Sequence, residues 1–124
     1  MLYHIVIAED EGDVREFLVR AFQRCAPKAT ILAATDGTEA LELIHSYGCD
    51  LLITDQRMPK MTGIELVEAL HRENKSFPTI VISADTTIEP AARAAGISAF
   101  YLKPLTLQQI RNMIQLWFPQ AGPA

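Results

Sequence analysis

The sequence alternates five times between a short apolar run and a segment with the pattern of an amphipathic helix. The runs lack the in–out alternation of half-exposed strands, which is typical of parallel strands covered on both faces. Five β–α units joined by right-handed crossovers predict an α/β fold, a doubly wound parallel sheet of five strands with five helices. The predicted strands are residues 3–8, 30–34, 51–54, 79–83 and 99–102.

Each apolar run is followed by residues that favour the start of a helix. In a capping box, Ser, Thr or Asp stands at the N-cap and Glu or Gln follows three residues later, so that two otherwise free backbone N–H groups are bonded. In the first box, Asp13 is expected to cap a helix, so we exclude it from the candidate site residues. The boxes are Asp13 with Glu16, Asp36 with Glu39, Thr62 with Glu65, Thr86 with Glu89, and Thr106 with Gln109.

The fourth predicted helix contains a conflict. Pro90 would be its fourth residue after Thr86, and proline has no N–H to donate. Either this helix starts later, nearer Pro90, or its first turn is irregular. We expect it to be the loosest of the five.

Apolar stripes at helical spacing mark the first and last helices. Three apolar residues of the last helix fall outside its stripe. Either the core-facing stripe is wide, or this helix contacts a second copy or a partner together with the fourth helix and fifth strand. The first stripe is Val14, Phe17, Leu18, Ala21, Phe22 and Cys25; the last is Leu107, Ile110, Ile114 and Trp117, with Met113, Leu116 and Phe118 outside it.

Length and composition indicate one domain without a membrane span. The 124 residues suit a single domain, which we place at residues 1–118, and residues 119–124 form a tail with nothing to pack or the start of a linker. The net charge of −4 argues against direct nucleic-acid binding. No apolar stretch approaches the ~18 residues of a membrane helix, and the acidic N-terminus is not a secretion signal. Cys25 and Cys49 are expected to be reduced thiols in a cytoplasmic protein.

Polar residues stand where the predicted strands end. Glu9 and Asp10 follow the first strand, Asp55 ends the third, Ser83 the fourth, and Lys103 follows the fifth. Because ligand sites of parallel α/β sheets lie beyond the carboxyl ends of the strands, these groups are expected to converge. Each alone is more simply a surface group. Together, three carboxylates would repel one another and raise their pKa values unless a cation or the lysine neutralises them.

This set of groups indicates a particular chemistry. Oxygen ligands of this kind suit Mg²⁺, or Mn²⁺ in its place. A carboxylate such as Asp55 can attack phosphorus and form an aspartyl phosphate, a reaction that depends on positioning and charge neutralisation.

Four segments resemble the receiver domain of two-component response regulators: IAEDE, LLITDQRMPKMTGIEL, IVISA and AGISAFYLKPL. The resemblance extends from residue 3 to about residue 118. The D-x-x-M-P-x-M-x-G block together with the later K-P pair is its most specific part. The resemblance implies a flavodoxin-like receiver fold with strand order 2-1-3-4-5. It also implies that Met58, Pro59 and Gly63 shape the turn after the third strand.

The resemblance assigns roles to the residues at the strand ends. Asp55 matches the phosphorylated aspartate. Glu9 and Asp10 match the acidic pair that, with Asp55 and the backbone carbonyl of Arg57, holds the metal ion.

Three further positions match the family's phosphoryl contacts and switch. Lys103 matches the lysine that pairs with the phosphoryl oxygens, and Ser83 matches the hydroxyl that bonds them. Phe100 matches the aromatic switch residue, which is expected to swing inward when Ser83 moves.

The implied function is a phosphorylation switch. A sensor histidine kinase or a histidine phosphotransfer protein would donate the phosphoryl group, and the switched domain would control a partner or an attached output domain. It is not expected to turn over small molecules. Two alternatives are an Asp-based, magnesium-dependent phosphatase or phosphotransferase and a receiver-like binding module that works without phosphorylation. The former usually needs a carboxylate two residues after the nucleophile, where this chain has Arg57.

Arg57 and Asp85 depart from the commonest pattern of the family. Both are expected to border the phosphate pocket. One hypothesis is that they pair across its mouth and slow the attack of water on the phosphoryl group; the other is that they are two unrelated surface charges.

Overall fold

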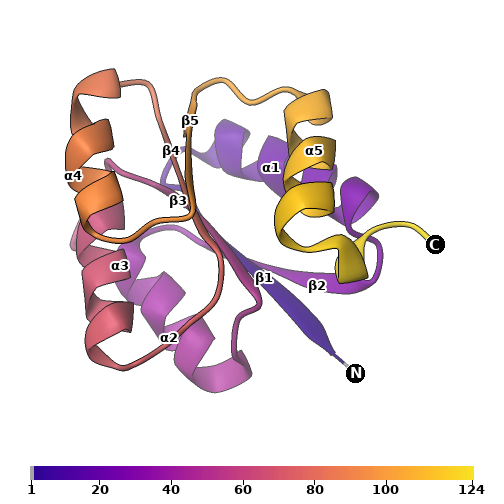
Figure 1. Ribbon diagram of the computed structural model, residues 1–124, viewed down its shortest axis with the longest axis horizontal. Coiled ribbons are helices and arrows are strands. Elements are labelled where there is room, and N and C mark those ends of the chain that lie inside the picture. Colours follow the sequence, from indigo (N-terminus) through magenta and orange to yellow (C-terminus); the bar gives the residue numbers. More distant parts are fainter. Residues whose placement is uncertain (1) are drawn as a thin grey trace.

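The computed structural model describes residues 2–124 and contains one sheet of five parallel strands in the order β2–β1–β3–β4–β5 (Figure 1). The sheet confirms the predicted architecture and strand order. The strands are β1 (Tyr3–Ala8), β2 (Ala29–Ala34), β3 (Leu51–Asp55), β4 (Thr79–Ser83) and β5 (Ala99–Leu102).

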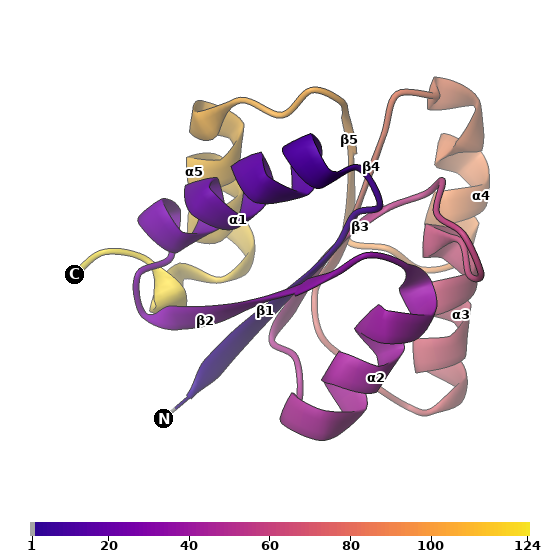
Figure 2. The ribbon, with the colours of Figure 1, turned by 180° about the vertical axis from the view of Figure 1, so that it is seen from behind.

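Five α-helices cover the two faces of the sheet. Helices α1 and α5 lie on one face, and α2, α3 and α4 lie on the other, as Figures 1 and 2 show. No helix among residues 2–124 has the length and apolar character needed to cross a lipid bilayer. The helices are α1 (Gly12–Cys25), α2 (Gly37–Tyr47), α3 (Gly63–Arg72), α4 (Glu89–Ala94) and α5 (Leu107–Trp117), with 3₁₀ turns η1 (Thr86–Ile88) and η2 (Pro119–Ala121).

The central strands are mainly apolar because each face of the sheet has its own core. In β1, Ile5 and Ile7 pack in the cluster formed with α1 and α5, whereas Val6 and Ala8 pack in the cluster formed with α2 and α3. Successive side chains of a strand point to opposite faces, so a strand buried on both sides needs apolar residues at every position.

The helix starts follow the predicted caps in part. Complete capping boxes begin α3 at Thr62 and α5 at Thr106. The Asp36 carboxylate caps α2 by accepting from the backbone N–H of Glu39. The prediction for Asp13 is wrong: α1 begins at Gly12, and Asp13 lies inside its first turn. A carboxylate is favourable there too, because it faces the positive end of the helix dipole.

The fourth helix has the predicted irregular start. A 3₁₀ turn, capped by the side chain of Asp85, precedes α4, which begins at Glu89 with Pro90 in its first turn. Pro90 is tolerated because the N–H groups of a first turn have no partner within the helix.

The ends of the chain pack more closely than expected. Met113 and Phe118, placed outside the apolar stripe of the last helix, are buried, so the wide core-facing stripe is correct and only Leu116, 67% exposed, points away. The expectation that residues 119–124 have nothing to pack is wrong for Ala121. Its side chain is fully buried, and its carbonyl oxygen accepts from the backbone N–H of Lys28 at 3.2 Å.

Candidate functional site

The carboxyl ends of four strands form a polar cavity of about 390 Å³ at one edge of the sheet. Six of the residues predicted for the site lie at this edge. Asp10, Asp55, Ser83, Lys103 and Arg57 line the cavity, and Glu9 lies behind them, fully buried. Phe100 lies on β5, half-buried beside Val81, and is not part of the cavity wall.

Three carboxylates converge in this cavity. One oxygen atom each of Glu9, Asp10 and Asp55 lies within 4.8 Å of the others. Glu9 and Asp55 are buried, and Asp10 is exposed. Such a cluster repels itself unless positive charge is supplied.

Lys103 supplies one positive charge inside the cluster. Its Nζ lies 2.8 Å from Glu9 Oε1, 3.1 Å from Asp55 Oδ2 and 3.9 Å from Glu11 Oε1. The side chain is only 15% exposed, so solvent screens these contacts weakly. One ammonium group is not enough to neutralise three carboxylates.

The pKa values at the site reflect this balance. Burial raises the pKa of Glu9, and the charge of Asp55 adds to the rise while Lys103 opposes it. Burial alone would lower the pKa of Lys103, but its contacts with Glu9 and Asp55 outweigh burial and raise that pKa. Lys103 therefore stays protonated and remains an electrostatic anchor rather than a proton donor.

The site fits a divalent cation of the magnesium kind. Its donors are carboxylate oxygens, which Mg²⁺ prefers. The buried Oε1 of Glu9 receives no well-aligned hydrogen bond within residues 2–124, although Lys103 Nζ is near it. A buried, charged oxygen without full hydrogen bonding is costly, and a cation would relieve that cost. Glu9, Asp10 and Asp55 are the residues that would hold it.

The backbone around Asp55 is held from several sides. Its Oδ1 accepts from the N–H of Gln56 at 2.8 Å, and its carbonyl oxygen accepts from the hydroxyl of Thr54. Gly63 packs against this turn so closely that a β-carbon there would collide with the carbonyl oxygen of Asp55. The Gln56 side chain also accepts from the N–H of Ile64 at the start of α3, a contact that the sequence did not predict.

Ser83 is tied to the loop that follows it. It is 2% exposed, and its Oγ accepts from the backbone N–H of Asp85 at 3.0 Å. Movement of the Ser83 side chain would therefore act on the backbone of Asp85.

Arg57 and Asp85 form the predicted pair. Arg57 Nη2 lies 3.2 Å from Asp85 Oδ2, joining the loops after β3 and β4. Hydrogen bonds from Thr87 and the nearby guanidinium of Arg57 lower the pKa of Asp85. The Arg57 side chain is 80% exposed, so the pair contributes little to stability.

Comparison with known proteins settles the family. The sequence model of the response regulator receiver domain matches residues 5–115. This chain belongs to that family. It is 31% identical over 122 residues to the chemotaxis protein CheY of Pseudomonas aeruginosa, covering 95% of this chain and 98% of that one.

Other relatives of this receiver domain differ in length. It is 36% identical over 113 residues to the Regulator of RpoS of Escherichia coli K12, covering 89% of this chain but only 33% of that protein. The chain thus spans about a third of that relative. The solved structure of CheY4 of Vibrio cholerae has a TM-score of 0.85 at 23% identity, covering 95% of this chain and all of that one, and confirms the fold.

Family membership agrees with phosphorylation-dependent signalling. Neither alternative function is favoured by these comparisons. Receiver domains generally bind Mg²⁺ at an acidic pocket, and Glu9, Asp10 and Asp55 form such a group here.

We predict that Arg57→Ala shortens the lifetime of phosphorylated protein several-fold, because water then reaches the phosphoryl group more freely. The decay is followed by intact mass after removal of the donor. Arg93→Ala is the control, since Arg93 also pairs with an acid, Glu89, but on α4. Equal lifetimes of wild type and Arg57→Ala would mean that the pair does not restrict water.

Proposed function

We propose that this domain accepts one phosphoryl group on Asp55 from the phosphohistidine of a sensor histidine kinase or a histidine phosphotransfer protein. A carboxylate oxygen of Asp55 attacks phosphorus, the phosphorus–nitrogen bond breaks, and the donor imidazole leaves with that electron pair. The product is an aspartyl phosphate, a mixed anhydride. The observation that supports this most is a buried Asp55 at a strand end with Lys103 Nζ at 3.1 Å.

The residues around Asp55 act on charge and position. Lys103 is the fixed positive charge nearest to the incoming group, and Ser83 offers a hydroxyl on the cavity wall. Bound magnesium would offset the negative charge that the phosphoryl group brings into the acidic cluster. The Arg57 backbone carbonyl is proposed as a further metal ligand. The domain acts as an acceptor and is not proposed to turn over small molecules.

The proposed output is a shift between two conformations. The phosphoryl group adds about −1.5 to −2 charges. Ser83 moves towards the phosphoryl group, which weakens its hydrogen bond with the N–H of Asp85 and loosens the loop before α4, and Phe100 then swings inward. To shift the ratio of active to inactive domain from 1:99 to 99:1, the phosphoryl group must favour the active conformation by ~5.5 kcal/mol.

An effector or second copy is proposed to contact α4, β5 and α5, where Leu102 is 48% and Leu116 67% exposed. Direct nucleic-acid binding and membrane insertion are not part of this proposal. A cytoplasmic location remains a prediction.

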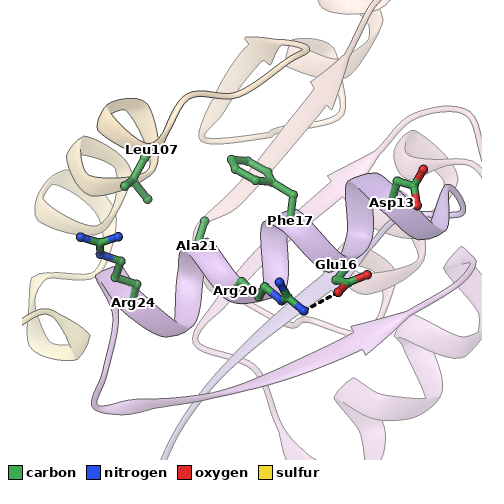
Figure 3. A pocket seen from close by; sticks show the side chains of 7 residues that line it. All are labelled: Asp13, Glu16, Phe17, Arg20, Ala21, Arg24 and Leu107. Carbon is green, nitrogen blue, oxygen red and sulfur yellow. Dashed lines mark ion pairs between the residues drawn. The ribbon is translucent and has the colours of Figure 1, made fainter.

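The surface beside the cavity is proposed to receive the donor protein. Phe17 is 45% exposed, although its spacing had placed it on the buried stripe. Figure 3 shows it projecting from α1 on the side of the helix towards Leu107 at the start of α5. A mainly apolar hollow also joins Phe17 and Val14 to Pro104 and Leu105, and Lys103 borders it. A donor seated there would present its histidine next to Asp55.

We predict a magnesium-dependent mass gain of one phosphoryl group when the protein is incubated with acetyl phosphate. Asp55 is the only acceptor in this proposal, so Asp55→Asn should gain nothing under the same conditions. Intact mass spectrometry measures both. An equal gain in Asp55→Asn, or a gain unaffected by EDTA, would contradict the proposed function.

We also predict that Phe17→Ala slows phosphorylation by a protein donor at least about tenfold, because aromatic contacts of this size are typical interface anchors. The donor used is the kinase or phosphotransfer protein of the source organism that transfers fastest to wild type. Phosphorylation by acetyl phosphate should not change. Tyr47→Ala is the control for loss of an exposed aromatic side chain, since Tyr47 is 58% exposed and lies at the end of α2. If Phe17→Ala slows both donors equally, its effect lies in the site and not in docking.

A further inference from the structure

Arg15 turns back from α1 towards the loop that carries the acidic pair. Its Nη1 donates to the carbonyl oxygen of Glu9 at 2.9 Å and lies 3.4 Å from the carbonyl oxygen of Asp10. The guanidinium passes over the first turn of the helix, where Nη2 would lie 3.8 Å from a β-carbon at Gly12. Both acceptors belong to the main chain, and neither is a carboxylate.

The contact fixes the backbone from which two metal-binding side chains project. The loop is also held at Glu9, whose N–H donates to the carbonyl oxygen of Ala34, and whose Oε2 accepts from the N–H of Glu11 at 3.1 Å. Arg15 adds hydrogen bonds to the carbonyl oxygens of Glu9 and Asp10 in the same loop. The directions of the Glu9 and Asp10 carboxylates therefore depend on a residue on the neighbouring helix.

We propose that Arg15 is a positioning residue for the magnesium site, an inference that rests on the proposed function. It holds the carbonyl groups of Glu9 and Asp10 so that their carboxylates converge with Asp55. Residues that orient metal ligands in this way typically change metal affinity 10–100-fold when they are replaced.

The charge of Arg15 and its positioning role predict opposite changes in Mg²⁺ affinity when Arg15 is removed. The guanidinium is positive and lies beside a cation site, so its loss would strengthen Mg²⁺ binding if only electrostatics mattered. Loss of positioning would weaken binding. The direction of the change therefore distinguishes the two roles.

The choice of arginine is also testable. A guanidinium presents several N–H donors in a fixed plane, so one group can reach two neighbouring carbonyl oxygens. The lysine ammonium, a compact group on a flexible four-carbon stem, keeps the charge but not this geometry. Arg15→Lys should therefore lie between wild type and Arg15→Gln in magnesium affinity.

The experiment is calorimetric titration of the full chain with MgCl₂ at constant ionic strength. We expect the dissociation constant to rise about tenfold in Arg15→Gln and by less in Arg15→Lys. Arg20→Gln removes the same charge from the same helix. Because Arg20 pairs with the exposed Glu16, the magnesium affinity of Arg20→Gln should stay near that of wild type. Without Mg²⁺, the NMR amide signal of Glu11 should shift in Arg15→Gln and not in Arg20→Gln.

The outcomes separate this inference from the proposed function. If wild type itself fails to bind Mg²⁺, the proposed function fails. If wild type binds and Arg15→Gln binds equally well or more tightly, Arg15 is not a positioning residue. Should Arg15→Gln fail to fold, Arg15→Lys decides, and unchanged affinity in that variant overturns the proposal.

Discussion

The contact of Lys103 with the buried carboxylates of Glu9 and Asp55 is the interaction on which the site depends. It crosses the sheet, because Glu9 follows β1, Asp55 ends β3 and Lys103 follows β5. Only the parallel order of the strands brings these positions to one edge. The ammonium group lessens the repulsion among the carboxylates but does not neutralise all of their charge, which favours the binding of a further cation.

The same edge joins the polar cavity to the loop before α4. Ser83 is bonded to the backbone of Asp85, and the side chain of Asp85 reaches both Arg57 and the first turn before α4. Under the proposed switch, a change at Ser83 would reach the loop at the mouth of the cavity and the start of α4. Helix α4 has only 6 residues, so little helical structure resists such a change.

Much of this architecture could be predicted because strand ends and cap residues are local signals. The groups at the strand ends were found because sheet topology alone brings them together. The burial of Met113 and Ala121 could not be predicted, because it depends on how α5 and the chain end cover the sheet. Arg15 was missed for a similar reason, since an arginine on a helix has no sequence signal that shows it folding back to a loop. Asp13 was misassigned because an acidic residue suits both the N-cap and the first turn.

The free energy of unfolding should be measured as a function of Mg²⁺ concentration in wild type and in Asp10→Asn, because it reports the repulsion among the carboxylates that a cation relieves. Asp10 belongs to the cluster but makes no ion pair with Lys103 within the described residues, so its neutralisation relieves repulsion without removing that contact. In EDTA, Asp10→Asn should be more stable than wild type by about 1 kcal/mol. Mg²⁺ should stabilise wild type by about 1.4 kcal/mol per tenfold excess over its dissociation constant, and Asp10→Asn far less. A less stable Asp10→Asn in EDTA, or the same response to Mg²⁺ in both proteins, would contradict the account.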